Sequence, residues 1–202
     1  MGGAAAAGSF AANAATPSCG PLCINLFNAR IGAGDILDVR SPNPPLGASI
    51  ALDPASITDT GEDFRLSAQG VVSEFIAANL MIPGLGALYG SDPVYEIVWT
   101  PGGQNFALCV GVAAPGPGIP ATGLPVTLQE CGVTVATTWI FHPVTTEGGS
   151  FYALINGATT TSTNPASLSG EQNALRTSAL AGSTQAQFRR HQLWGEFMGV
   201  VP

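Results

Sequence analysis

The chain has no lysine, and charged residues make up only 9% of its 202 residues. The net charge of −7 repels a phosphate backbone, so we expect no nucleic-acid partner. The two histidines, His142 and His191, lie in no nucleophile motif, and no glycine-rich stretch leads into Lys-Ser or Lys-Thr. No apolar run approaches the roughly 20 residues of a membrane span. These absences predict a protein without catalytic residues, cofactor or membrane-spanning helix.

The composition is apolar and rich in turn-forming residues. Hydrophobic residues make up 46% of the chain, with 26 glycines and 16 prolines. Disordered chains combine low hydrophobicity with high net charge, which does not describe this sequence. Many glycines and prolines between short apolar segments are typical of an all-β protein with tight turns.

The N-terminal segment has some features of an export signal. Residues 1–14 are rich in alanine and glycine, and Ala12-Asn13-Ala14 has the small-x-small pattern of a cleavage site. A positively charged leading region is missing, so a flexible tail is the alternative. We expect a secreted protein in which residues 15–202 form a single domain.

The four cysteines favour disulfides over a metal site. Cys109 and Cys131 flank a predicted hairpin and would close it, while Cys19 and Cys23 would close a small local loop. A zinc site usually needs four ligands in two closely spaced pairs, and here only one pair is closely spaced. We therefore predict no metal site.

Three similar units follow one another along the chain. Each reads as strand, turn, short strand, loop and aromatic residue, with period-2 alternation in the strands. In order, they contain residues 36–39, 49–52 and Phe64; residues 108–112, 126–131 and Trp139; and residues 153–157, 165–168 and Trp194. This repetition predicts a β-trefoil: twelve strands forming a six-stranded barrel capped by hairpins, with an inserted loop at residues 77–93. A helical turn or two is predicted within residues 71–80.

These segments resemble the ricin B-type β-trefoils, the R-type lectins. Ile36-Leu-Asp-Val39 resembles their opening strand, Cys109 and Cys131 resemble their repeat disulfide, and Gln192-Leu-Trp194 is a full Gln-x-Trp signature. The C-terminal His-Gln-Leu-Trp-Gly segment is also similar to that of a group of uncharacterised secreted actinobacterial proteins. The likeness implies that Gln192 and the aromatics Phe64, Trp139 and Trp194 belong to the core.

The same resemblance implies where sugars would bind. An R-type site uses an Asp on the opening strand and an aromatic ring on the next turn. Only Asp38 fits the Asp role, because Gly111 and Asn156 are expected at the matching positions, and no aromatic residue lies between Phe27 and Phe64. The other candidate ligand residues are Asn156, Asn164 and Trp99.

Each candidate also has a purely structural interpretation. Asp38 could stabilise a turn by accepting backbone N–H groups. Asn156-Gly157 is typical of a type I′ turn. Trp99 follows an apolar strand and is expected to be buried, although the region from Tyr89 to Trp99 is where aromatic stacking on a ligand would be sought.

The leading functional hypothesis is a carbohydrate-binding, lectin-like module with degenerate sites. The alternatives are a protein-binding trefoil of the Kunitz-inhibitor kind, with Pro115-Gly-Pro-Gly-Ile-Pro120 as its exposed loop, or a structural trefoil without a ligand. The expected partner is therefore a glycan or another protein.

Overall fold

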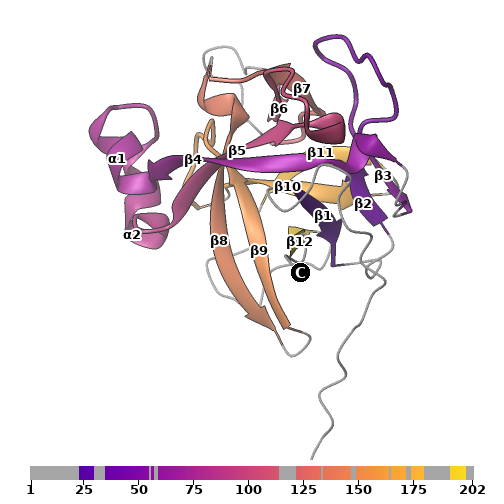
Figure 1. Cartoon of the computed structure of the whole chain (residues 1–202). Coiled ribbons are helices and arrows are strands. Elements are labelled where there is room, and N and C mark those ends of the chain that lie inside the picture. Colours follow the sequence, from indigo (N-terminus) through magenta and orange to yellow (C-terminus); the bar gives the residue numbers. More distant parts are fainter. Residues whose placement is uncertain are drawn as a thin grey trace, which may run out of the picture.

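The computed structural model describes residues 23–29, 35–54, 56, 59–113, 122–132, 134–146, 149–163, 165–171, 174–179 and 192–198. Strands dominate this part of the chain (Figure 1). The helical elements are α1 (Val72–Ala77), α2 (Gly86–Tyr89) and the 3-10 helices η1 (Thr60–Glu62), η2 (Pro83–Leu85), η3 (Pro101–Gly103) and η4 (Val135–Thr137). None of these helices is long and apolar enough to cross a membrane.

Six strands close into a barrel. They are β1 (Ile24–Asn28), β4 (Phe64–Val71), β5 (Pro93–Trp99), β8 (Thr138–Thr146), β9 (Gly149–Asn156) and β12 (Leu193–Met198). Antiparallel pairing runs from β1 through β4, β5, β8, β9 and β12 back to β1, so the ring has no free edge. Closure removes the exposed edges that invite association with other chains.

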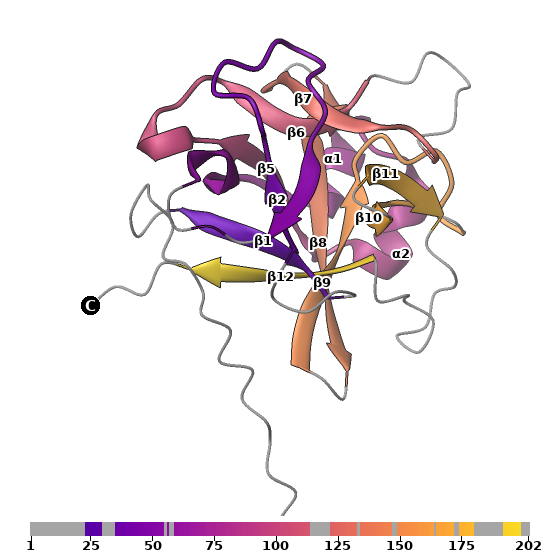
Figure 2. The ribbon, with the colours of Figure 1, turned by 90° about the vertical axis from the view of Figure 1, so that its right-hand side faces the viewer.

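Three hairpins cap the barrel. They are β2 (Asp35–Asp38) with β3 (Ala51–Pro54), β6 (Leu108–Val112) with β7 (Val126–Glu130), and β10 (Ala166–Glu171) with β11 (Ala174–Ala179). Figure 2 shows these hairpins above β1 and β12, while the tip of the β8–β9 hairpin projects in the opposite direction. Barrel and cap together form a β-trefoil, so the predicted fold is confirmed.

Aromatic residues fill the centre of the barrel. Phe64, Trp139 and Trp194 each have 0% exposure, and each lies at the start of the last strand of its unit. Aliphatic residues from all three units surround them, among them Leu37, Val110 and Leu168. The two tryptophans of this set have their indole N–H groups satisfied: Trp139 Nε1 donates to Val110 O at 2.8 Å, and Trp194 Nε1 donates to Leu168 O at 3.0 Å.

Each of three cross-strand pairs in the barrel contains one indole. Trp139 lies opposite Asn156, and Trp194 lies opposite Asn28. In the third pair the tryptophan lies on the other strand, because Phe64 occupies the position of Trp139 and Trp194 and lies opposite Trp99. The barrel thus holds one large ring and one smaller side chain at each of three positions. This balance is what close packing requires, since cores tolerate volume-conserving exchanges better than changes in total volume.

The segment predicted as an inserted loop at residues 77–93 is partly helical. It carries η2 and α2, and α1 immediately precedes it, which confirms the predicted helical turn within residues 71–80. The segment lies at the side of the barrel (left in Figure 1). Its apolar side chains pack against outward-facing residues of β5, β8, β9 and β12 in a second apolar cluster: Val72, Met81, Leu85, Tyr89, Val94, Ile140, Val144, Ala153, Ile155 and Leu193. The insertion therefore covers an apolar outer face that a bare barrel would leave in water.

The disulfide between Cys109 and Cys131 is confirmed, with a Cα–Cα distance of 5.1 Å. It joins the start of β6 to the residue after β7 and so closes the second cap hairpin. Cys23 is also disulfide-bonded. Its predicted partner, Cys19, lies outside the described residues, as do the predicted export signal of residues 1–14 and its cleavage site.

Candidate functional site

Strand register identifies the equivalent positions of the three units and corrects one sequence prediction. Phe27 pairs with Ile36, Val98 with Cys109 and Ile155 with Ser167, where each barrel strand meets its cap hairpin. Ile36, Cys109 and Ser167 are the cap-hairpin members of these pairs. The residues two positions after them are Asp38, Gly111 and Ser169, which are therefore equivalent. Asn156 is not the counterpart of Asp38, because the segment 153–156 is a barrel strand rather than a cap strand.

Asn156 is a core residue with 0% exposure. Its Nδ2 donates to Ala136 O at 2.9 Å, and its Oδ1 accepts from the backbone N of Ala158 at 3.1 Å. These bonds leave its side chain no exposed atom for a sugar. The predicted type I′ turn is wrong too, because Gly157 does not adopt a positive φ. Glycine is needed there for space, since a Cβ would overlap Thr138 Oγ1 and lie 2.7 Å from Val135 O.

Trp99 is also buried, with 1% exposure, at the barrel position that Asn28 and Asn156 occupy in the other units. Its indole Nε1 has no hydrogen-bond partner among the described residues. The ring of Phe106 lies over it, with ring centroids 5.4 Å apart and an interplanar angle of 33°. Trp99 therefore packs beneath Phe106, and Phe106 rather than Trp99 reaches the surface.

Phe106 is the exposed ring of this pair, with 45% exposure. Gln104 and Asn105, both exposed, precede it in the loop between η3 and β6. The loop is locally fixed: Asn105 Oδ1 accepts from Ala107 N at 2.9 Å, and Ala107 O accepts from Cys131 N at 3.0 Å. Ala107 has a φ of 55°, a conformation that non-glycine residues adopt uncommonly. The result is a surface ring held in place after two exposed amide residues, which the sequence reasoning missed.

Asp38 lies at the end of β2 with only 2% exposure. Its Oδ1 has no partner among the described residues, and it faces Gly61, on which any Cβ would overlap it. Burial, then the nearby carboxylates of Asp59 and Asp53, raises the pKa of Asp38 to about 7. This carboxyl is enclosed by protein, so it does not present itself to a ligand on the surface.

Further acidic groups surround Asp38. Asp53 on β3 forms an exposed ion pair with Arg40, whose Nη2 donates at 2.7 Å, and this bond lowers the pKa of Asp53. Glu62 has 1% exposure and accepts from Ser56 N at 2.9 Å. Burial raises the pKa of Glu62 to about 7, against the opposing effect of the Ser56 N–H.

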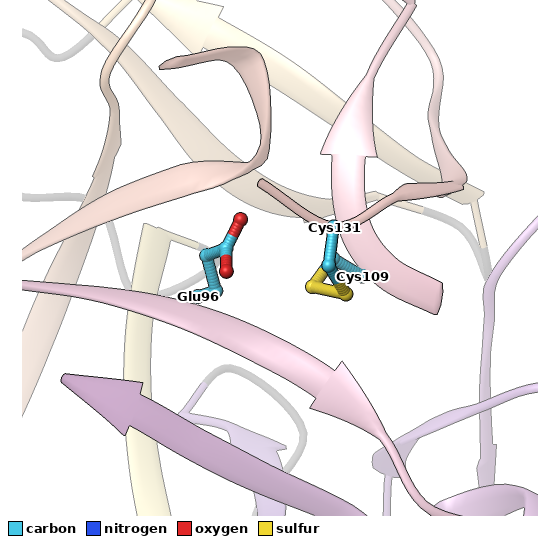
Figure 3. Close-up of side chains that lie close together, drawn as sticks. All are labelled: Glu96, Cys109 and Cys131. Carbon is cyan, nitrogen blue, oxygen red and sulfur yellow. A yellow bond between two sulfur atoms is a disulfide. The ribbon is translucent and has the colours of Figure 1, made fainter. Parts of the chain in front are cut away.

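A different trio has metal-ligand spacing but cannot hold a metal. Among the described residues, Glu96, Cys109 and Cys131 are the group whose ligand atoms all lie within 4.8 Å of one another. Figure 3 shows that the two sulfurs are bonded to each other, so neither is a thiolate ligand. Glu96 Oε1 instead accepts from Gly132 N at 2.6 Å and from Thr137 Oγ1 at 2.9 Å. Glu96 thus fastens the disulfide turn to η4.

The insertion carries a carboxylate–imidazole pair. His142 Nδ1 lies 2.7 Å from Asp92 Oδ2, and the ring of Tyr89 packs edge-on against the imidazole with centroids 5.0 Å apart. Burial raises the pKa of Tyr89, which keeps its phenol neutral. These contacts connect the end of the insertion to β8.

The remaining predicted residues are partly accounted for. Gln192 has 1% exposure, and its Nε2 donates to Ser167 Oγ at 3.0 Å. Asn164, the Pro115–Pro120 loop and His191 lie outside the described residues. Asp38, Trp99 and Asn156 do not form one site, because Trp99 and Asn156 occupy equivalent barrel positions of two units while Asp38 belongs to a cap hairpin.

Known structures share the fold. The designed three-fold symmetric protein ThreeFoil superposes with a TM-score of 0.53 at 16% identity, over 86% of this chain and 96% of that one. The receptor-binding domain of botulinum neurotoxin D gives a TM-score of 0.51 at 8% identity, over 87% of this chain and 40% of that chain. A mosquitocidal holotoxin gives 0.52 at 10% identity, over 89% and 17%. No protein-family model and no curated protein sequence matches the chain.

Proposed function

We propose that this chain is a secreted, non-enzymatic carbohydrate-binding module in which the ring of Phe106 is the stacking surface for a sugar. The observation that carries the proposal is the exposed Phe106 ring held over the buried indole of Trp99. It gives the second unit an exposed aromatic ring, which the turn after Asp38 in the first unit lacks.

The chemistry of the loop suits a sugar. The apolar face of a pyranose ring loses water on contact with an aromatic ring, and nearby amides then orient its hydroxyl groups. Gln104 and Asn105, which directly precede Phe106, are exposed and carry amide groups. The surface is shallow, so we expect weak binding to single sugars, strengthened where several copies or several sugars are linked.

Secretion is supported by the disulfide chemistry. The Cys109–Cys131 bond and the bonded Cys23 are typical of proteins that fold in oxidising compartments. The neighbours of known structure support the proposal less directly. One of them is described as a toxin's receptor-binding domain, but at 8% identity the likeness extends to the fold alone.

The test is a glycan array probed with the wild-type protein, Phe106→Ala and Leu46→Ala. Leu46 is a matched control because it is also an exposed apolar residue on a loop, with 62% exposure. We expect a defined set of glycans to bind the wild type and Leu46→Ala, with about ten-fold weaker binding by Phe106→Ala, equivalent to roughly 1.4 kcal/mol. Phe106→Trp should keep the same glycans.

Two outcomes would reject the proposal. Equal binding by Phe106→Ala and the wild type would place any sugar elsewhere. Silence on every glycan by a folded protein would point to a protein ligand, which a protease panel directed at the Pro115–Pro120 loop would examine next.

A further inference from the structure

Oxygen atoms from three neighbouring segments converge beside Gly61 at the edge of the first cap hairpin. A Cβ built on Gly61 would overlap Asp38 Oδ1 and lie 2.5 Å from Val39 O and 3.0 Å from Asp59 Oδ1. Gly61 is therefore required for space, because the three oxygens pack directly against it. Asp59 Oδ1 accepts a hydrogen bond from the Gly61 N–H at 2.8 Å.

Two buried oxygens in this region lack any donor. Asp38 Oδ1 and Asn25 Oδ1 belong to residues that are each 2% exposed, and neither atom has a hydrogen-bond partner among the described residues. Asn25 Nδ2 donates to Glu62 O at 2.8 Å, which places this amide beside η1. Unpaired buried acceptors are costly, typically about 1–3 kcal/mol each.

Several carboxylates lie around these oxygens. Asp53 approaches from β3, Asp59 from the loop before η1, and Glu62 from η1 itself. Among the described side chains, the cation near them is Arg40, which is largely exposed and already paired with Asp53. A set of acceptors without matching donors is suited to a positively charged ligand.

We propose that Asp38 Oδ1, Asp59 Oδ1, Val39 O and Asn25 Oδ1 bind a divalent cation of the calcium class. All four ligands are oxygens, from carboxylates, a backbone carbonyl and an amide, which is the ligand set that Ca²⁺ takes. Calcium tolerates irregular geometry, whereas Mg²⁺ requires a near-ideal octahedron, and Zn²⁺ favours nitrogen and sulfur ligands that are not offered here. The bound cation would fasten η1 to β1 and β2, and so would hold the first unit's loop on the barrel.

A proton is the competing occupant. Burial, together with the nearby carboxylates of Asp59 and Asp53, raises the pKa of Asp38 to about 7, so a proton competes with a cation for this carboxyl at neutral pH. If protons alone satisfied these oxygens, calcium would bring no stabilisation at neutral pH. The experiment therefore measures the effects of calcium and of pH separately.

The test uses the full chain stripped with EDTA, with calorimetric titration of CaCl₂ and thermal unfolding at pH 7.5. We expect heat of binding and a rising unfolding midpoint, with MgCl₂ much weaker. Asp59→Asn should weaken calcium binding about ten-fold or more, because it removes one ligand charge while Asn keeps the cap on Gly61 N. Asp92→Asn is the matched control, since that carboxylate pairs with His142 on the insertion and should leave calcium binding unchanged.

Three results would overturn the proposal. The first is no heat and no midpoint shift up to about 10 mM calcium, ten times the weakest typical affinity of extracellular calcium modules. The second is unchanged calcium affinity in Asp59→Asn. The third is a midpoint that rises on acidification but is indifferent to calcium at every pH, which would assign the oxygens to protons alone.

Discussion

The three tryptophans offer a matched test of how the barrel core is stabilised. Trp99, Trp139 and Trp194 are almost equally buried, with 1%, 0% and 0% exposure. They differ in hydrogen bonding: the indole N–H is hydrogen-bonded to a backbone carbonyl in Trp139 and Trp194 but has no partner among the described residues in Trp99. Burial alone predicts that Trp→Phe costs the same at all three positions, whereas hydrogen-bond satisfaction predicts a large difference.

The magnitudes follow from the contacts. Replacing a buried indole by a phenyl ring removes apolar contact worth about 2 kcal/mol at every position. In Trp139→Phe the carbonyl of Val110 also loses its donor, which adds roughly 1–3 kcal/mol. In Trp99→Phe the change instead removes an unsatisfied buried N–H, which offsets a similar amount. We therefore expect Trp139→Phe and Trp194→Phe to cost about 3–5 kcal/mol and Trp99→Phe about 1 kcal/mol or less.

Urea unfolding followed by circular dichroism measures these differences, provided that the slope m is the same in all variants. The ordering is the critical result, because the apolar loss is common to the three variants. Three costs within about 0.5 kcal/mol of one another, the scatter of ordinary surface substitutions, would refute the reasoning. A Trp99→Phe variant that is the least stable of the three would refute it more strongly.

Other predictions rest on single features. Reduction of the Cys109–Cys131 bond, or the Cys109→Ser/Cys131→Ser pair, should lower the free energy of unfolding by about 3 kcal/mol, seen as a midpoint lower by roughly 6–12 °C; a loss below 1 kcal/mol would contradict the loop-entropy argument. In EDTA, stability should fall as the pH rises from about 4 to about 7, because burial raises the pKa of Asp38 and Glu62 to about 7 and the folded state then binds more protons than the unfolded chain. Thermal scans at half-unit pH intervals test this, and an Asp38→Asn variant with the same pH slope would contradict it. Asn156→Ala should cost about 2–4 kcal/mol in urea unfolding, because it leaves the buried Ala136 carbonyl without its donor, and a cost below 1 kcal/mol would return Asn156 to the list of candidate ligand residues.

The architecture could be predicted from the sequence because it depends on repeated local patterns. Short apolar strands separated by turns, one aromatic residue per unit and the cysteine spacing together indicated the trefoil and the Cys109–Cys131 bond, and both are confirmed. The sequence pattern places the cap hairpin of the third unit one strand too early in the chain. Residues 153–156 end in two apolar residues and a polar one, as Ile36-Leu-Asp38 does, so local pattern does not separate a barrel strand from a cap strand. Long-range pairing decides between them, and β11 (Ala174–Ala179) has too little apolar alternation to be recognised.

The candidate site was harder to predict because exposure depends on backbone geometry. An aromatic residue in a trefoil is expected in the core, and Phe106 reaches the surface through a loop in which Ala107 has a φ of 55°. Alanine gives no sequence signal for that conformation. In the same way, Asp38 is buried because Gly61 packs against it. Gly61 lies 23 positions later in the chain, and the sequence gives no signal of this contact.

Three-fold repetition separates what the fold needs from what it does not. Where all units carry similar residues, as with the buried aliphatics Leu37, Val110 and Leu168, the core explains the choice. Asp38 differs, because its equivalents are Gly111 and Ser169. The second and third units therefore form the same part of the cap hairpin without a carboxylate. The fold therefore does not require a buried acid there, and burying an unpaired one is unfavourable. A residue that costs stability in one unit and is dispensable in the other two is best explained by a ligand, and this asymmetry makes the first cap hairpin the first place to test for a bound cation.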